Sequence, residues 1–467
     1  MREARPVGPE GSRTPPGWAI VGALAFTGLT SAFMFTLVVP LQAELPALLD
    51  ASREDTTWVV TITLLVAAVA TPISGRLGDM YGKRRVILAL LVALMIGSAV
   101  AALSTSIAWL IVGRGLQGLT TGVIPLGIAI MRDVLSPKRL GTAVALMSAT
   151  MGVGGAIGMP LAALVAYMSD WHALFWMSAA LGALGFAAVR WCVPESELRS
   201  GGRLDVLGVI GLAVGLTGLL LYVSRGAEWG WASPLALGAL GIGLAVLLLW
   251  GGYQLRRADP LVDLRVAARP SVLFANLAGF GMGFALFASN VTFPQLLELP
   301  RETGAGFGLT MFEAALCIMP AGVIMMVLSP LSGLLERVFG PRLLLSIGTA
   351  SIVLAYVFVL LWSSEVWHIV LSNCIIGVGI AFSFAAMPMI IMRAVPAHET
   401  GVSNGLNALF RSVGTSSASA VMGGVLAAMS TEQGPGREAF EICFWISLAA
   451  AVLGTVLALL VPRPARG

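Results

Sequence analysis

The sequence predicts an all-α integral membrane protein with about fourteen membrane-spanning helices, each of roughly 20 apolar residues. The first observation is composition, because 57% of the 467 residues are hydrophobic and only 11% are charged. Soluble domains carry roughly 25% charged residues. The second is a mean hydropathy of +0.90. The third is the placement of the basic residues, which gather in alternate polar segments between the apolar runs.

The chain opens with a polar segment, residues 1–16, which contains three arginines. We expect a cytoplasmic tail there and not a cleaved signal, because the following apolar run is too long for one. Residues 462–467 are expected to form a second cytoplasmic tail. Between the tails, the apolar runs predict spans at 17–42, 56–75, 86–104, 107–131, 140–168, 173–191, 205–223, 232–254, 271–294, 310–332, 341–362, 366–392, 400–429 and 440–461.

The loop charges agree with this order of spans. If both termini are cytoplasmic, alternate loops hold nearly all the Arg and Lys residues, with a bias of about five to one, as the positive-inside rule requires. The loops predicted to lie outside contain only Arg53, Arg225, Arg301 and Arg437. The sequence therefore predicts a multi-pass protein of the cell membrane, in contact with the lipid bilayer.

Several other classes of protein are excluded by the composition. The four cysteines and three histidines are scattered singly, so we expect no metal site, no cofactor and no disulfide. The net charge of +4 comes from loop residues without a long basic run, so nucleic acid is not an expected partner. An enzyme or a receptor is disfavoured, because no catalytic constellation and no soluble domain of useful size is visible.

The segment from Gly75 to Arg85 is short, charged and punctuated by glycines, and we expect a tight hairpin there. One interpretation is an ordinary basic loop on the inside. The spacing of Gly75, Asp79, Gly82 and Arg84, however, resembles the loop between helices 2 and 3 of the major facilitator superfamily. The resemblance implies a conformational latch that stabilises the outward-facing state.

The same resemblance implies the major facilitator fold with two six-helix halves, residues 17–191 and 271–461. A count of fourteen spans then leaves an inserted two-helix hairpin at 205–254. The segment from Gly333 to Arg342 repeats the opening motif, but Arg337 stands where Asp79 would align, so we expect a degenerate second latch. Parallel repeats place the substrate site between the halves, near the bilayer midplane.

Arg114 is a cation inside a predicted span that carries no acid of its own. Such a charge costs at least about 2.5–3.5 kcal/mol on insertion scales, so it needs a cavity or a partner. Together with Gln117 and Gly118, it resembles the Arg-x-x-Gln-Gly motif of drug/proton antiporters, which implies a role in proton transfer. The alternative is an arginine that snorkels to the membrane surface.

The fifth predicted span contains Gly154, Gly158 and Pro160. Small residues at this spacing allow helices to approach closely, and proline bends a helix. The stretch resembles the antiporter motif of exporters, although Met159 and two alanines depart from the pattern. Helix packing is therefore the firmer interpretation, and export direction is the weaker one.

Arg411 is the second cation inside a predicted span, and Asn404 and Asn407 share its helical face. The segment resembles the thirteenth helix of the fourteen-span drug/proton antiporter subfamily. One polar face on an apolar helix predicts the lining of a substrate cavity. Interhelical hydrogen bonding is the alternative.

Proton coupling requires a titratable acid, and the spans offer few. The first span, where relatives of this subfamily often have an acid, contains none, which argues against a first-helix carboxylate for cationic drugs. Glu313, at the start of the tenth span, is the best candidate, with a helix-capping role as the alternative. Asp55 is a weaker candidate. Glu399 is expected to pair with the latch arginines and close the inner gate.

These observations predict a monomeric, proton-coupled exporter of small amphipathic compounds that works by alternating access. The proton-coupling residues would be Arg114, Gln117, Glu313 and Arg411, with protons and the substrate as partners. A carrier for one specific metabolite is the alternative within the same fold.

Overall fold

The computed structural model describes residues 17–38, 41, 45–195, 204–431 and 434–462. The predicted tails at 1–16 and 463–467 lie outside these residues. The helices are α1 (Gly17–Thr36), α2 (Leu45–Leu48), α3 (Arg53–Tyr81), α4 (Lys83–Ala102), α5 (Ile107–Gly118), η2 (Leu119–Gly122), α6 (Val123–Val134), α7 (Pro137–Met168), α8 (His172–Cys192), α9 (Val206–Trp229), α10 (Pro234–Arg256), α11 (Leu264–Ala267), α12 (Pro270–Glu298), η3 (Arg301–Thr303), α13 (Met311–Phe339), α14 (Pro341–Leu361), α15 (Val366–Ala394), η4 (Ala397–Glu399), α16 (Thr400–Ala428) and α17 (Arg437–Leu460). A two-residue pair, β1 (Ser430–Thr431) and β2 (Gly434–Pro435), precedes α17.

Twelve helices in the described part of the chain are long and apolar enough to cross a membrane, counting α5 to α6 as one. The helices at the fifth and thirteenth predicted positions, α7 and α16, have 32 and 29 residues but are not among the twelve. In α16 the apolar character is diluted by asparagines, serines and Arg411. The all-α fold is confirmed, and the count of fourteen spans stays a prediction.

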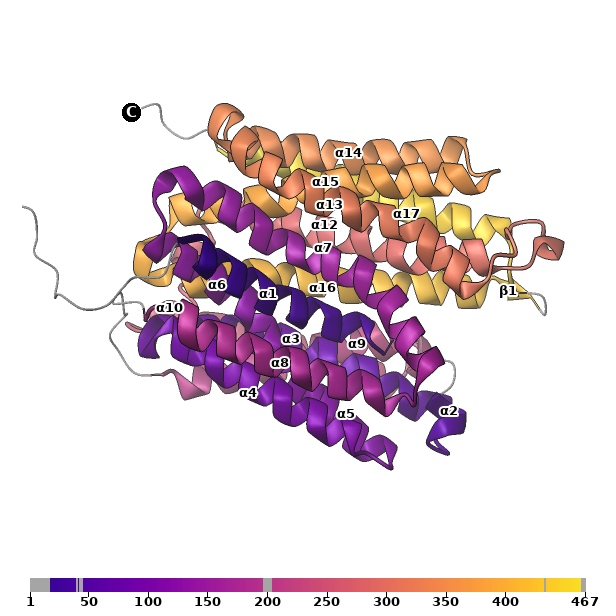
Figure 1. The fold of residues 1–467 in the computed structure, drawn as a ribbon, viewed down its shortest axis with the longest axis horizontal. Helices are drawn as coiled ribbons and strands as arrows, with labels where there is room; N and C mark the ends of the chain where they lie inside the picture. Colours follow the sequence, from indigo (N-terminus) through magenta and orange to yellow (C-terminus); the bar gives the residue numbers. More distant parts are fainter. Residues whose placement is uncertain (1–16, 39–40, 42–44, 196–203, 432–433, 463–467) are drawn as a thin grey trace, which may run out of the picture.

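Two helical bundles make up most of the molecule (Figure 1). We call α1–α8 the N-terminal bundle and α12–α17 the C-terminal bundle. The largest hydrophobic core lies within the C-terminal bundle, from Val266 to Val461. Two further cores lie within the N-terminal bundle, and one of them also includes Met389 and Met392 of α15. Each bundle therefore has a hydrophobic core built mainly from its own helices.

The α9–α10 hairpin packs across the line where the two bundles meet. Leucines 212, 216 and 220 of α9 form one apolar cluster with Ala68 of α3 and with Val402 and Leu409 of α16. At the far end of α9, the guanidinium of Arg225 lies 4.4 Å from the ring centre of Trp58 in α3. The hairpin therefore contacts both bundles through the same helix.

The segment from Gly75 to Arg85 differs from its prediction. Helix α3 continues through Gly75 to Tyr81, and α4 starts at Lys83, so the expected hairpin loop is reduced to a turn at Gly82. Gly82 has a φ of 110°, which side-chain-bearing residues rarely adopt, and its N–H donates to the carbonyl of Gly78. The charged side chains of the motif consequently belong to helices α3 and α4 and not to a loop.

Candidate functional site

Arg114 is completely buried in the N-terminal bundle, so it does not snorkel to the surface. Its guanidinium donates to the main-chain carbonyl of Met34 and to Oε1 of Gln117, each at 2.8 Å, and to the carbonyl of Val59 at 3.3 Å. Gln117 in turn donates to Ser98 at 2.8 Å. All of these acceptors are neutral, so the charge of Arg114 is solvated by amide and carbonyl oxygens and not by a carboxylate.

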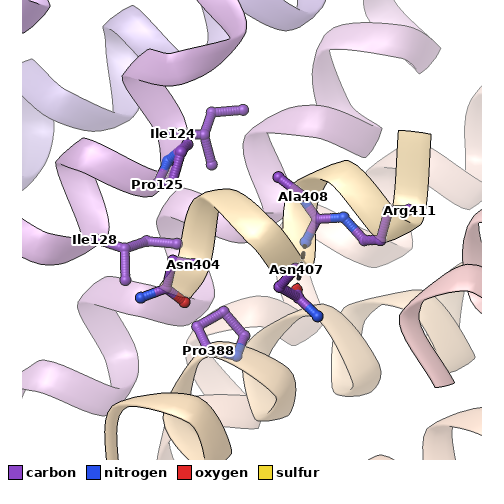
Figure 2. A pocket seen from close by; sticks show the side chains of 8 residues that line it. All are labelled: Ile124, Pro125, Ile128, Pro388, Asn404, Asn407, Ala408 and Arg411. Carbon is purple, nitrogen blue, oxygen red and sulfur yellow. Dashed lines mark hydrogen bonds between the residues drawn. The ribbon is translucent and has the colours of Figure 1, made fainter. Parts of the chain in front are cut away.

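A pocket of at most about 190 Å³ lies between the two bundles (Figure 2). Its walls come from α6 in the N-terminal bundle and from α15 and α16 in the C-terminal bundle. The lining residues are Ile124, Pro125, Ile128, Pro388, Asn404, Asn407, Ala408 and Arg411. The structure thus brings the three polar residues predicted on α16 to one pocket between the bundles.

Arg411 has weak partners for a buried cation. One terminal nitrogen is 3.4 Å from Oδ1 of Asn407, and the other is 3.3 Å from the sulfur of Met151 in α7. The guanidinium carbon lies 4.7 Å from the ring centre of Phe384 in α15. Nε of Arg411 and Oδ1 of Asn404 are buried without a hydrogen-bond partner. Met151, Phe384 and Pro388 belong to this site although no motif singled them out.

Both bundles are joined at the end of the molecule where α3 ends and α16 begins. We call this end, with residues 76–85, 132–139 and 393–402, the basic end. Asp79 is buried there and accepts hydrogen bonds from the main-chain N–H groups of Gly401 at 3.3 Å and Val402 at 3.0 Å. These are first-turn donors of α16, which have no partner within the helix. An acid at the end of α3 therefore caps a helix of the other bundle.

Arg132, at the end of α6, is a contact that sequence reasoning missed. It donates to the hydroxyl of Thr400 and to the main-chain carbonyls of Val395 at 3.2 Å and Pro396 at 3.4 Å. Its position in a basic loop was visible in the sequence, but nothing there indicated which carbonyls it would reach. Between described residues, all hydrogen bonds that join the bundles involve Asp79, Arg132 or Arg411.

Two expected latch contacts are not formed. Glu399 was expected to pair with the latch arginines, but its carboxylate lies 3.6 Å from Nε2 of the neighbouring His398. Arg84 points to the opposite side, where it donates to the main-chain carbonyl of Arg190 at the end of α8. The reason is the helical start of α4, which directs Arg84 toward its own bundle and away from α16.

Glu313 is also placed differently from the expected proton site. It is exposed at the third position of α13 and forms a capping box, accepting from the N–H and the hydroxyl of Thr310, each at 2.9 Å. The helix-capping alternative therefore describes its position. Asp55 has the same kind of role at the start of α3, with Ser52 at 2.7 Å. Neither acid lines the pocket.

Gly154 and Gly158 face α1 within the N-terminal bundle. A Cβ at Gly154 would lie 2.5 Å from the Cβ of Ala32, and one at Gly158 would overlap the hydroxyl of Thr36. Pro160 follows inside α7, which continues to Met168. Near its start, α7 instead contacts α13 of the other bundle, where a Cβ at Gly141 would lie 3.1 Å from the carbonyl oxygen of Gly333. Helix α7 thus leaves the C-terminal bundle as it runs toward the end opposite the basic end, as Figure 1 shows.

The segment predicted to form a degenerate second latch contains one buried acid, and the degeneracy of this latch stays a prediction. Glu336 of α13 is 2% exposed and pairs with Arg393 at the end of α15. A Cβ at Gly141 of α7 would lie 3.0 Å from Oε2 of Glu336. The acid is one position before Arg337, the residue aligned with Asp79, so the alignment of the repeat did not indicate it.

Two bundles with a pocket between them are the geometry of a transporter, and the comparisons with known proteins agree. The sequence profile of the Major Facilitator Superfamily matches residues 24–419. The chain belongs to this superfamily. Its known members are transporters and not enzymes, so the chain is a multi-pass membrane transporter.

Relatives in this superfamily include drug-resistance proteins. The lincomycin resistance protein LmrB of Bacillus subtilis (strain 168) is 25% identical over 467 residues, covering 95% of each chain. The multidrug transporter protein MdtP of the same organism is 23% identical, covering 91% of this chain and 77% of MdtP. These relatives are consistent with the fourteen-span drug-efflux subfamily. Among solved structures, the human organic anion transporter MFSD10 (TETRAN) has a TM-score of 0.66 at 16% identity, covering 95% of this chain and all of that one, which shows the shared fold.

Proposed function

We propose that the chain is a monomeric, proton-coupled exporter of small amphipathic compounds in the cell membrane, with both termini cytoplasmic. The observation that carries the proposal is the pocket between the bundles, which holds a buried arginine and two asparagines among apolar residues. A few polar groups on an apolar wall are typical of sites for small molecules. The chain is similar to LmrB, a lincomycin resistance protein, and to MdtP, a multidrug transporter protein, which supports drugs or antibiotics as substrates.

Alternating access is supported by the distribution of contacts. The hydrogen bonds of Asp79 and Arg132 join the bundles at the basic end, whereas further along α7 the face with Gly154 and Gly158 packs against α1 of its own bundle. If the basic end is cytoplasmic, this conformer is closed to the inside. The pocket, at most about 190 Å³, is smaller than the usual 300–1,000 Å³ of a ligand site, so α6 and α7 must move to admit a drug.

Proton coupling is proposed to use Arg114, Gln117 and the buried acids of the basic end. Arginine does not release its proton in proteins, so Arg114 would act through its charge on groups that titrate nearby. Asp79 is the first candidate, because its hydrogen bonds to α16 are lost when the bundles separate. Glu336 is the second candidate, because it is buried beside α7 but keeps its partner Arg393 within its own bundle. We therefore assign the proton to these carboxylates, Asp79 before Glu336, in place of Glu313.

The test uses inside-out membrane vesicles with a respiration-driven pH gradient. Amphipathic compounds are added one at a time, and dissipation of the gradient is recorded for the wild type, Asp79→Asn, Glu336→Gln and Arg114→Met. We expect several unrelated compounds to dissipate the gradient in the wild type, and Arg114→Met to abolish the response. Glu313→Gln serves as the matched control and should behave as the wild type does.

The alternative, a carrier for one specific metabolite, is favoured by the small volume of the pocket. In the same vesicles, no response to any amphipathic compound would contradict drug export. Uptake or exchange of a single labelled metabolite would then establish the alternative. A full response in the Asp79→Asn and Glu336→Gln variants would retain the exporter but remove these acids from the proton path.

A further inference from the structure

The pocket between the bundles contains the positive charge of Arg411 without a carboxylate beside it. The guanidinium of Arg411 carries five N–H donors, and an ionised carboxylate is its usual strong partner. Here it has one long contact to Asn407, one to the sulfur of Met151 and the face of Phe384, while Nε has no partner. Yet the side chain is only 7% exposed. A buried cation with unused donors indicates a missing acceptor.

No acid of the described residues can supply this acceptor. Three acids of the described chain are buried. Asp79 accepts from α16 at the basic end, Asp205 accepts from Gln254 in the hairpin, and Glu336 pairs with Arg393. Each of these three carboxylates therefore has its partners outside the pocket, and no described carboxylate lies within ion-pair distance of Arg411.

The rest of the pocket has the chemistry of an amphipathic ligand. Ile124, Pro125 and Ile128 of α6 and Pro388 of α15 supply apolar walls. Oδ1 of Asn404 is buried without a donor, on the same helical face as Arg411 (Figure 2). An occupant that offers an anionic oxygen to Arg411, a hydrogen-bond donor to Asn404 and an apolar body to α6 would satisfy every one of these groups.

We propose that the transported compounds are organic anions, with a carboxylate bound by Arg411 and an N–H or O–H group beside it bound by Asn404. This inference rests on the proposed export function and names the substrate class of that site. A cationic compound would place like charges together in a site where water is scarce, and the energy of that repulsion rises as the dielectric constant falls. A negative-inside membrane potential also favours the outward movement of an anion.

The experiment measures binding to the purified full-length chain in lipid nanodiscs, without a proton gradient. The probes are dansylglycine, which is a carboxylate, its uncharged amide dansylglycinamide, and the cation dansylcadaverine. All three carry the same fluorescent apolar group, so their affinities differ mainly through charge. We expect dansylglycine to bind about tenfold more tightly than the amide, as one charge-assisted hydrogen bond would give.

The variants separate a binding role from a structural one. Arg411→Met should lower the affinity for dansylglycine by about tenfold and leave dansylglycinamide unchanged, because only the charge contact is lost. Arg411→Lys, which keeps the charge, should recover part of the affinity and serves as the second variant if Arg411→Met does not fold. Arg337→Met, which removes an exposed arginine of α13, is the matched control and should bind as the wild type does.

Equal affinity for the acid and the amide, tightest binding of the cation, or no binding of dansylglycine would each overturn the proposal. An unchanged affinity in Arg411→Met would do the same. Because this assay needs no gradient, its outcome is independent of proton coupling. Selective anion binding without dissipation of the gradient would retain the anion site and remove proton export, and the reverse result would retain export and remove the anion site.

Discussion

Two contacts between the bundles at the basic end both place a glycine against the backbone of the opposite helix. They differ in the hydrogen bonds of the acid beside that glycine. In the first, α3 meets α16, and a Cβ at Gly75 would lie 2.5 Å from the carbonyl oxygen of Gly401. In the second, α13 meets α7, and a Cβ at Gly333 would overlap the backbone of Thr142. Asp79 bonds across the first contact, whereas Glu336 bonds to Arg393 within its own bundle.

This difference predicts which kind of interaction stabilises each contact. At both contacts a glycine packs directly against the backbone of the opposite helix. Any copy of the motif that keeps this glycine can form the same close packing. Only Asp79 adds a charge-assisted hydrogen bond to the first-turn N–H groups of the opposite bundle, where the helix dipole also favours an anion. The α3–α16 contact should therefore respond to charge, and the α7–α13 contact to shape alone.

One readout tests this comparison. The four native cysteines are replaced, and a single Ala408→Cys places a thiol in the pocket. Its labelling rate by a membrane-impermeant maleimide added from the basic end reports how often that end opens. Each prediction below is a change in this rate.

The largest effect is expected from side chains placed between the bundles. Gly75→Val and Gly333→Val each insert atoms against backbone, at a cost of about 1–3 kcal/mol in the closed conformer. That cost corresponds to an increase of roughly 5- to 150-fold in labelling, if the open conformer is unaffected. Gly238→Val is the matched control, because a Cβ there would meet nothing within 4 Å. Labelling at the wild-type rate in both variants would show that these glycines do not set the closed state.

An intermediate effect is expected from Asp79→Asn, which keeps the shape and removes the charge. The lost charge–dipole and charge-assisted interactions are together worth about 1–2 kcal/mol, so labelling should rise by roughly 5- to 30-fold. Glu336→Gln should change the rate by less than about twofold, because Glu336 and Arg393 belong to the same bundle and their pair is kept when the bundles separate. Equal responses of the two variants would contradict the proposed asymmetry.

The smallest effect is expected from Glu313→Gln at the opposite end of α13. Glutamine can replace glutamate in a capping box, so the helix start should lose only a few tenths of a kcal/mol. Labelling should be unchanged, and transport in the vesicle assay should equal that of the wild type. Loss of gradient dissipation in this variant would return Glu313 to the proton path and contradict its role as a helix cap.

The sequence by itself determined the properties that depend on neighbours along the chain. Hydropathy gave the class of protein and the positions of the long helices, because a membrane span must be apolar over its own length. The glycines aligned from the repeat, Gly82 and Gly340, both fall at turns between consecutive helices with positive φ. Arg114 and Arg411 were expected inside spans because a charge is conspicuous in an apolar run, and both are buried.

Only the tertiary structure decided which residues meet. Arg132 reaches carbonyls more than 260 positions away, and Glu399 turns to His398 instead of the arginines of α4. Glu336 is buried although it is one position out of register with Asp79, since the angle at which α13 meets α7 selects the face that is covered. Such partners are set by helix orientation and crossing angle, which local patterns do not encode. The pocket at Arg411 also depends on helix orientation, because its walls come from helices of both bundles.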